Sequence, residues 1–141
     1  MLIQTHRDPI SACNSFNSLL YSTHRVVSEK TDPARMIAAN VQLLENETHL
    51  NMAARDAHPN AVLDVYYDRI THDPIGTVQR VYDHFGLEWS KTLEEKLQSY
   101  VRKHPKGMHG EHNYDLAGLG PTDAEIERRF SAYLEKFGIK G

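Results

Sequence analysis

The chain has 141 residues, of which 40% are apolar and 25% are charged, so its composition is that of a globular protein rather than a disordered one. No apolar run approaches the ~20 residues needed to span a bilayer, and a formal net charge of −3 gives no argument for binding nucleic acid. Cys13 is the sole cysteine, which excludes an internal disulfide and any multi-cysteine metal site and fits a reducing compartment. We therefore expect a cytoplasmic protein that forms one domain over residues 1–141, with no membrane span and no nucleic-acid partner.

The chain opens on a β-prone segment, residues 2–6, that leads straight into a candidate ligand site. A strand in that position is more typical of the interior of a sheet than of the start of a domain. We therefore expect that an N-terminal part is missing, through truncation, a misassigned start or fragmentation.

Three Asp-Pro pairs mark expected helix starts. An aspartate carboxylate accepts hydrogen bonds from the amides of a first helical turn, and proline suits the first helical position because no amide hydrogen is needed there. The pairs Asp8-Pro9, Asp32-Pro33 and Asp73-Pro74 predict helices from residue 9 to about 21, from 33 to about 57 and from 74 to about 85.

The remaining elements complete an alternation of strand and helix. Residues 61–67 are β-prone and follow a His-Pro-Asn stop, so they predict a second strand. Ser90 predicts the cap of a fourth helix, and Thr122 opens a capping box for a last helix that ends at Gly138. Two strands separated by long helices predict an α/β fold with parallel pairing. Two strands alone make a poor sheet, so partner strands must come from a missing N-terminal part or from another chain, including a second copy.

Arg7 lies where the first strand gives way to the first helix, and open parallel α/β sheets bind ligands beyond the carboxyl ends of their strands. Its planar guanidinium fits a phosphate bidentately. Ser11, Ser15 and Ser18 recur at helical spacing, so a hydroxyl two turns into the helix can reach the same anion, and the helix N-terminus adds favourable dipoles. The alternative is that Arg7 pairs with an acid on a neighbouring loop and the serines form a solvated face.

Three segments resemble, in order, sulfotransferases that use 3′-phosphoadenosine-5′-phosphosulfate (PAPS). Residues 5–15, Thr-His-Arg-Asp-Pro-Ile-Ser-Ala-Cys-Asn-Ser, look like the motif that binds the 3′-phosphate. Residues 65–87 look like the segment that runs from Tyr-Glu-Asp-Leu through Asp-Pro to Gly-Leu. Residues 103–119 are similar to the loop and closing helix of bacterial-type members. The chain is thus identified by resemblance as the C-terminal part of a bacterial-type sulfotransferase domain.

The resemblance implies an α/β, helix-rich fold with a P-loop-type parallel sheet and flanking helices, truncated at its N-terminus. It implies that Arg7 and Ser15 hold the 3′-phosphate of PAPS, the sulfuryl donor, for transfer to an acceptor hydroxyl or amine. The family's loop for the 5′-phosphate and its catalytic base have no counterpart here, so we assign no catalytic residue and expect these 141 residues alone to be inactive. A non-catalytic nucleotide-binding remnant and an interaction module remain alternatives, and the acceptor is left open.

The segment from Arg102 to Tyr114 holds three fixed cations and three histidines against one acid, which predicts a lid over a phosphate. Sulfotransferases have a basic loop near this place, which implies Arg102 and Lys103 as further cofactor-binding residues, although His104-Pro105 replaces the family's glycine after them. The alternative is a surface loop with no ligand. We predict no metal site there, because the spacing of its three histidines, His104, His109 and His112, lacks rigid helical geometry and an obvious general base.

Three further residues are assigned structural roles. His6 is expected to point into the sheet, and Asp64 needs a partner if it is buried. Cys13 is expected to be packed rather than reactive, because no flanking cation clearly activates it.

Overall fold

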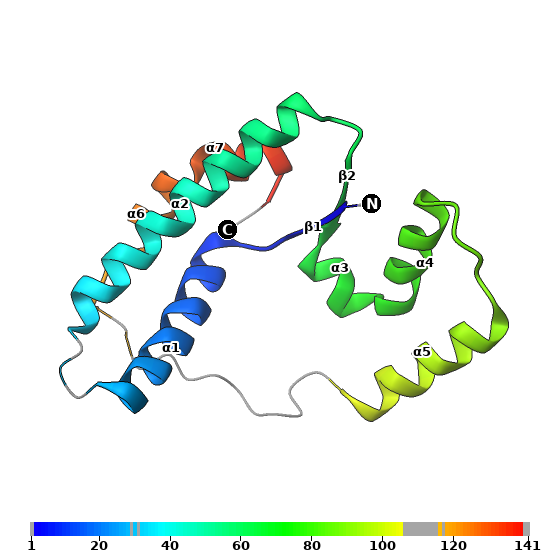
Figure 1. The fold of residues 1–141 in the computed structure, drawn as a ribbon, viewed down its shortest axis with the longest axis horizontal. Helices are drawn as coiled ribbons and strands as arrows, with labels where there is room; N and C mark the ends of the chain where they lie inside the picture. The colour runs from blue at the N-terminus through cyan, green and yellow to red at the C-terminus, as the bar shows by residue number, and fades with distance from the viewer. Residues whose placement is uncertain (1, 29, 31, 106–115, 117, 140–141) are drawn as a thin grey trace. The chain divides into compact units, whose positions relative to one another are not determined.

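A computed structural model describes residues 2–28, 30, 32–105, 116 and 118–139 (Figure 1). The elements within these residues are, in chain order, β1 (Leu2–His6), α1 (Pro9–Val27), α2 (Pro33–Ala57), β2 (Val62–Tyr66), α3 (Tyr67–His72), α4 (Pro74–His84), α5 (Lys91–Lys103), α6 (Asp123–Arg129) and α7 (Ser131–Phe137). They fall into two compact units. Of the described residues, those in 2–6 and 58–105 form the sheet unit, and those in 7–57 and 116–139 form the helical unit.

The sheet unit is built on the parallel pair β1 and β2, whose register runs from Leu2 opposite Val62 to His6 opposite Tyr66. Helix α4 packs on β2 and α3, and α5 packs on α4. One face of the sheet and these helices line an open apolar groove of about 350 Å³. Its lining residues include Ile3, Thr5, Val65, Val78, Leu97 and Tyr100. Parallel pairing between strands separated by long helices confirms the predicted α/β class.

The helical unit packs α1 and α6 together and sets α2 against both α1 and α7 (Figure 1). Its buried core consists of Cys13, Ile37, Val41, Ile126 and Phe130. Ile37 and Val41 lie one helical turn apart on α2 and are both buried, so burial of this apolar face holds the long helix in place.

All three predicted helix starts are confirmed. Asp32 Oδ1 accepts a hydrogen bond from the Arg35 amide at 3.2 Å, and Asp73 Oδ1 accepts one from the Gly76 amide at 2.9 Å. Asp8 caps α1 in the same way. These contacts are local in sequence, which is why the Asp-Pro pairs predicted them.

The predicted helix ends at Gly86 and Gly138 are confirmed by their backbone angles. Their φ values are 63° and 60°, in the left-handed region where a residue without a Cβ is favoured.

The prediction for the end of α1 was wrong, because the helix continues to Val27 rather than stopping near Tyr21. The Ser22 and Thr23 hydroxyls donate to the carbonyls of Ser18 and Leu19 at 2.8 and 2.6 Å, so polar residues of this last part bond back into the helix. Residues 22–28 are exposed, so no apolar stripe signalled the extension.

Two later boundaries also differ from expectation. The second strand ends at Tyr66, and helix α3 follows directly. No side-chain cap begins this helix, so no capping residue indicated it in the sequence. The last helix is divided at Phe130, whose φ and ψ of −97° and 12° separate α6 from α7. Phe130 is 5% exposed and belongs to the core, so packing favours this bend over a straight helix.

None of the described helices combines the length and the apolar character that crossing a membrane requires.

Candidate functional site

The candidate site begins at Asp8, which links Arg7 to the first turn of α1. Asp8 Oδ1 accepts from the Ile10 amide at 3.1 Å, and Oδ2 accepts from the Ser11 amide at 2.9 Å. Pro9 occupies the first helical position and is buried. Two amides of the first turn therefore already donate to the Asp8 carboxylate, although a helix N-terminus was expected to favour a bound anion.

The charge on Asp8 is well stabilised. Burial by itself would raise the pKa of this carboxyl, but hydrogen bonds from the Ser11 hydroxyl and the Ser11 and Ile10 amides, together with the nearby Arg7 charge, lower the pKa below its ordinary value of 3.8. Asp8 is therefore ionised at neutral pH, and a cation and a helix N-terminus both lie beside it.

The serines of α1 divide into two kinds. Ser11, Ser15 and Ser18 fall within about 60° of one another around the helix axis, as their spacing predicted. The Ser11 hydroxyl is engaged with Asp8. Ser15 is half-buried, and its hydroxyl has no hydrogen-bond partner in the part of the chain that the structure describes. Ser15 is thus better suited than Ser11 to bind a ligand.

Contacts with α2 fix the rotation of α1. Cys13 is 1% exposed and lies in the core, and Asn17 is 3% exposed and accepts a hydrogen bond from Asn40 Nδ2 at 3.2 Å. Cys13 lies about 200° around the axis from Ser15. Packing of Cys13 against the core therefore directs Ser15 away from it.

Cys13 itself is a structural residue, as expected. Burial, with a smaller contribution from the Asp8 charge, raises the pKa of its thiol to about 11. The thiolate that nucleophilic or metal chemistry needs is therefore scarce at neutral pH.

The buried His6 supplies the partner that Asp64 was expected to need. His6 Nε2 lies 2.9 Å from Asp64 Oδ1, and the His6 ring stacks on Tyr66 with 5.2 Å between ring centroids. The His6 side chain has no exposed surface. A carboxylate only accepts, so Nε2 carries the hydrogen and donates. His6 is closed to a substrate from outside, which agrees with its predicted structural role.

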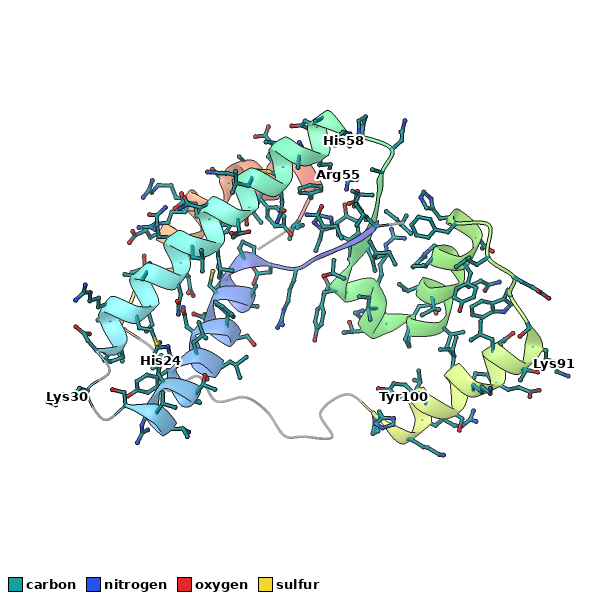
Figure 2. The ribbon with its side chains drawn as sticks, viewed as in Figure 1. His24, Lys30, Arg55, His58, Lys91 and Tyr100 are labelled. Carbon is teal, nitrogen blue, oxygen red and sulfur yellow. The ribbon has the colours of Figure 1, made fainter. Side chains whose placement is uncertain are left out.

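Arg102 and Lys103 occupy the last turn of α5, in the sheet unit, and both are exposed. His104 caps the end of this helix: its amide donates to the Tyr100 carbonyl at 3.0 Å, and its ring stacks on Tyr100 with 4.2 Å between centroids. Figure 2 labels Tyr100 on this helix. The positive charges of Arg102 and Lys103 interact favourably with the negative, C-terminal end of the helix dipole. Arg7 and Ser15 belong to the other unit, so the two predicted pairs of ligand residues lie on separate units.

Most of the predicted lid, including His109 and His112, lies outside the described residues. Within the described part of the chain, no three histidine, cysteine or acidic side chains are grouped as a metal site would require.

The comparison with protein families matches residues 1–91 to the description "Sulfotransferase family". The chain belongs to the sulfotransferase family. The resemblance drawn from the motifs around Arg7 and after Asp64 is thereby confirmed. Among curated proteins, none matches the chain.

The fold of this sulfotransferase-family chain is also that of a solved relative. The crystal structure of sulfotransferase STF9 from Mycobacterium avium matches with a TM-score of 0.86 at 22% sequence identity. The match covers 99% of this chain and 36% of the STF9 chain. The match confirms the predicted P-loop-type sulfotransferase fold. This chain spans about a third of the length of the STF9 chain.

Sequence reasoning missed two arginines that the fold places near β2. Arg69 on α3 and Arg80 on α4 line the same cavity, although eleven positions separate them in the chain. Helix α3 was not predicted, so no sequence pattern indicated that these two residues line one cavity.

Proposed function

We propose that residues 1–141 form the C-terminal portion of a sulfotransferase domain and bind the 3′-phosphate of PAPS through Arg7 and Ser15. The proposed reaction is sulfuryl transfer from PAPS to an acceptor hydroxyl or amine. Ser15 carries the proposal, because its half-buried hydroxyl has no partner among the described residues and lies two turns along the helix that follows Arg7.

The residues present fit a phosphate ester. Arg7 contributes a permanent positive charge and a planar set of N–H donors, and Ser15 contributes a hydroxyl donor. The Asp8 oxygens are engaged by the Ile10 and Ser11 amides, so Asp8 holds the turn in shape. When bound, PAPS supplies the activated sulfuryl group.

In this proposal the chain holds the nucleotide and does not perform the chemistry. Arg7 and Ser15 bind and orient the 3′-phosphate, and Arg7 partly neutralises its charge. Arg102 and Lys103 are proposed as further contacts to the same phosphate. We assign no catalytic residue and expect the chain by itself to transfer no sulfate.

Calorimetric titration with adenosine 3′,5′-bisphosphate tests the assignment. Arg7→Ala should weaken binding by about 1.5–3 kcal/mol, and Ser15→Ala by about 0.5–1.5 kcal/mol, the ranges for charged and neutral hydrogen bonds. Arg128→Ala and Ser22→Ala are matched controls in the same unit, because Arg128 is exposed on α6 and the Ser22 hydroxyl is bonded to its own helix. Adenosine 5′-monophosphate lacks the 3′-phosphate, so its affinity should not respond to Arg7→Ala. Equal effects of Arg7→Ala and Arg128→Ala on the bisphosphate would refute the site.

A hybrid separates the enzyme from the two alternatives. The chain is joined to the N-terminal part of a related sulfotransferase, and transfer of labelled sulfate is measured. Transfer that Arg7→Ala abolishes supports the proposed reaction. A hybrid that binds the bisphosphate without transfer favours a non-catalytic remnant, and one that ignores the nucleotide altogether favours an interaction module.

A further inference from the structure

The sheet unit contains a second set of basic residues, separate from Arg7. Arg69 of α3 and Arg80 of α4 both line a cavity of about 240 Å³, and residues 63–66 of β2 line it as well. The cavity reaches Tyr66, the last residue of β2. Ligands of parallel α/β sheets bind at this end of the strands.

The charges around this cavity favour an anion. Two arginines line it, and Asp64 is the one acid among its described lining residues. The Asp64 carboxylate is also engaged elsewhere, because its Oδ1 accepts from buried His6 at 2.9 Å. The positive charge of the arginines is therefore only partly offset.

A buried hydroxyl positions one of the two arginines. Arg80 Nη2 donates to Thr77 Oγ1 at 3.0 Å, and the Thr77 hydroxyl donates to the Asp73 carbonyl at 2.7 Å. Thr77 is 6% exposed, so it anchors the guanidinium from below the surface. This contact uses one of the five N–H donors that an arginine carries.

The other donors of the two arginines have no acidic partner among the described residues. Across the residues that the structure describes, neither Arg69 nor Arg80 forms an ion pair. Arginine forks bind tetrahedral oxyanions bidentately, and two arginines that line one cavity suit a doubly charged group.

We propose that this cavity binds a sulfate or phosphate group between Arg69 and Arg80. Its volume is several times the ~30 Å³ that a water molecule occupies in the liquid, so it accommodates the anionic group with part of a molecule that carries it. The proposal does not rest on the nucleotide site, since Arg7 and Ser15 are not among the residues that line the cavity.

The test is a titration of the full chain, followed through the NMR signals of arginine side-chain N–H groups. Separate arms use inorganic sulfate, inorganic phosphate and an aryl sulfate ester at constant ionic strength, because screening alone shifts exposed charges. The Arg69 and Arg80 signals should shift with saturation. Arg69→Ala and Arg80→Ala should each raise the Kd about tenfold or more, the lower limit for a hydrogen bond to a charged group.

Three variants complete the design. Arg80→Lys keeps the charge without the fork and should weaken binding less than Arg80→Ala. Arg128→Ala and Arg7→Ala should leave these shifts unchanged, so failure at this cavity and failure at the nucleotide site are distinguishable. Tighter binding of the ester than of both inorganic anions identifies a carried group, and the reverse order identifies a free anion. Shifts that do not saturate, or an Arg69→Ala/Arg80→Ala double variant that binds like the unaltered chain, would overturn the proposal.

Discussion

Asp8 offers a way to separate the stability of α1 from the charge beside Arg7. Replacement of an N-cap by alanine costs about 0.5–2 kcal/mol. Asp8 accepts from two amides, at 3.1 and 2.9 Å, and from the Ser11 hydroxyl, so we expect a cost above the lower end of that range. We therefore expect Asp8→Ala to lower the free energy of unfolding of the helical unit by about 1–2 kcal/mol at pH 7.

Asp8→Asn should behave differently, because asparagine caps helices about as well as aspartate. The variant keeps one accepting oxygen, but its Nδ2 cannot accept the second first-turn amide, and it loses the attraction of a negative charge to Arg7 and to the helix N-terminus, the latter typically about 0.3–1 kcal/mol. The two substitutions thus distinguish the geometry of the cap from its charge.

The pH dependence supplies a second signature. The pKa of Asp8 is lowered in the folded chain, so its contribution to stability is fully present above the unfolded value of 3.8 and is lost as the pH falls through the lower folded pKa. Unaltered protein should therefore lose this contribution on acidification below about pH 4, and Asp8→Asn should lack that part of the change.

Denaturant unfolding followed by circular dichroism, repeated between pH 3 and 7, measures both effects. Asp73→Ala is a matched control, because Asp73 also caps a helix whose first residue is proline, but in the sheet unit. The reasoning about Asp8 fails if Asp8→Asn destabilises the chain as much as Asp8→Ala does, or if the acid-dependent loss is unchanged in Asp8→Asn.

Two further predictions concern buried polar groups. Cys13 should resist thiol reagents at pH 8 in the folded chain, since its pKa of about 11 leaves little thiolate, and should react fully in denaturant; rapid labelling without denaturant would contradict its burial. His6→Phe should lower the free energy of unfolding by about 1.5–3 kcal/mol, because the charged Asp64 carboxylate loses the hydrogen bond that His6 donates. Gln4→Leu changes the residue opposite Asp64 in the sheet and should lower the free energy of unfolding by less than about 0.5 kcal/mol. Equal unfolding midpoints for the two variants would show that the His6 contact contributes nothing.

The sequence by itself determined the features that arise from residues close together in the chain. The aspartate of each Asp-Pro pair reaches amides two or three residues ahead, so Asp8, Asp32 and Asp73 marked their helix starts without any tertiary information. The order of strands and helices indicated parallel pairing, because antiparallel neighbours would not need so long a connection. Arg7 and Ser15 were likewise recognised from the sequence, since eight positions separate them along one strand and the helix that follows it, and their binding of a phosphate stays a prediction.

Only the tertiary structure decided which distant residues meet. The pairing of His6 with Asp64 depends on the register of β1 and β2, and a slip of one residue would turn Asp64 to the other face of the sheet. The bend at Phe130 depends on burial in a core to which other helices contribute. The shared cavity of Arg69 and Arg80 depends on how α3 and α4 pack beside β2. Sequence patterns report the contacts of a segment with itself, whereas these features follow from packing between segments far apart in the chain.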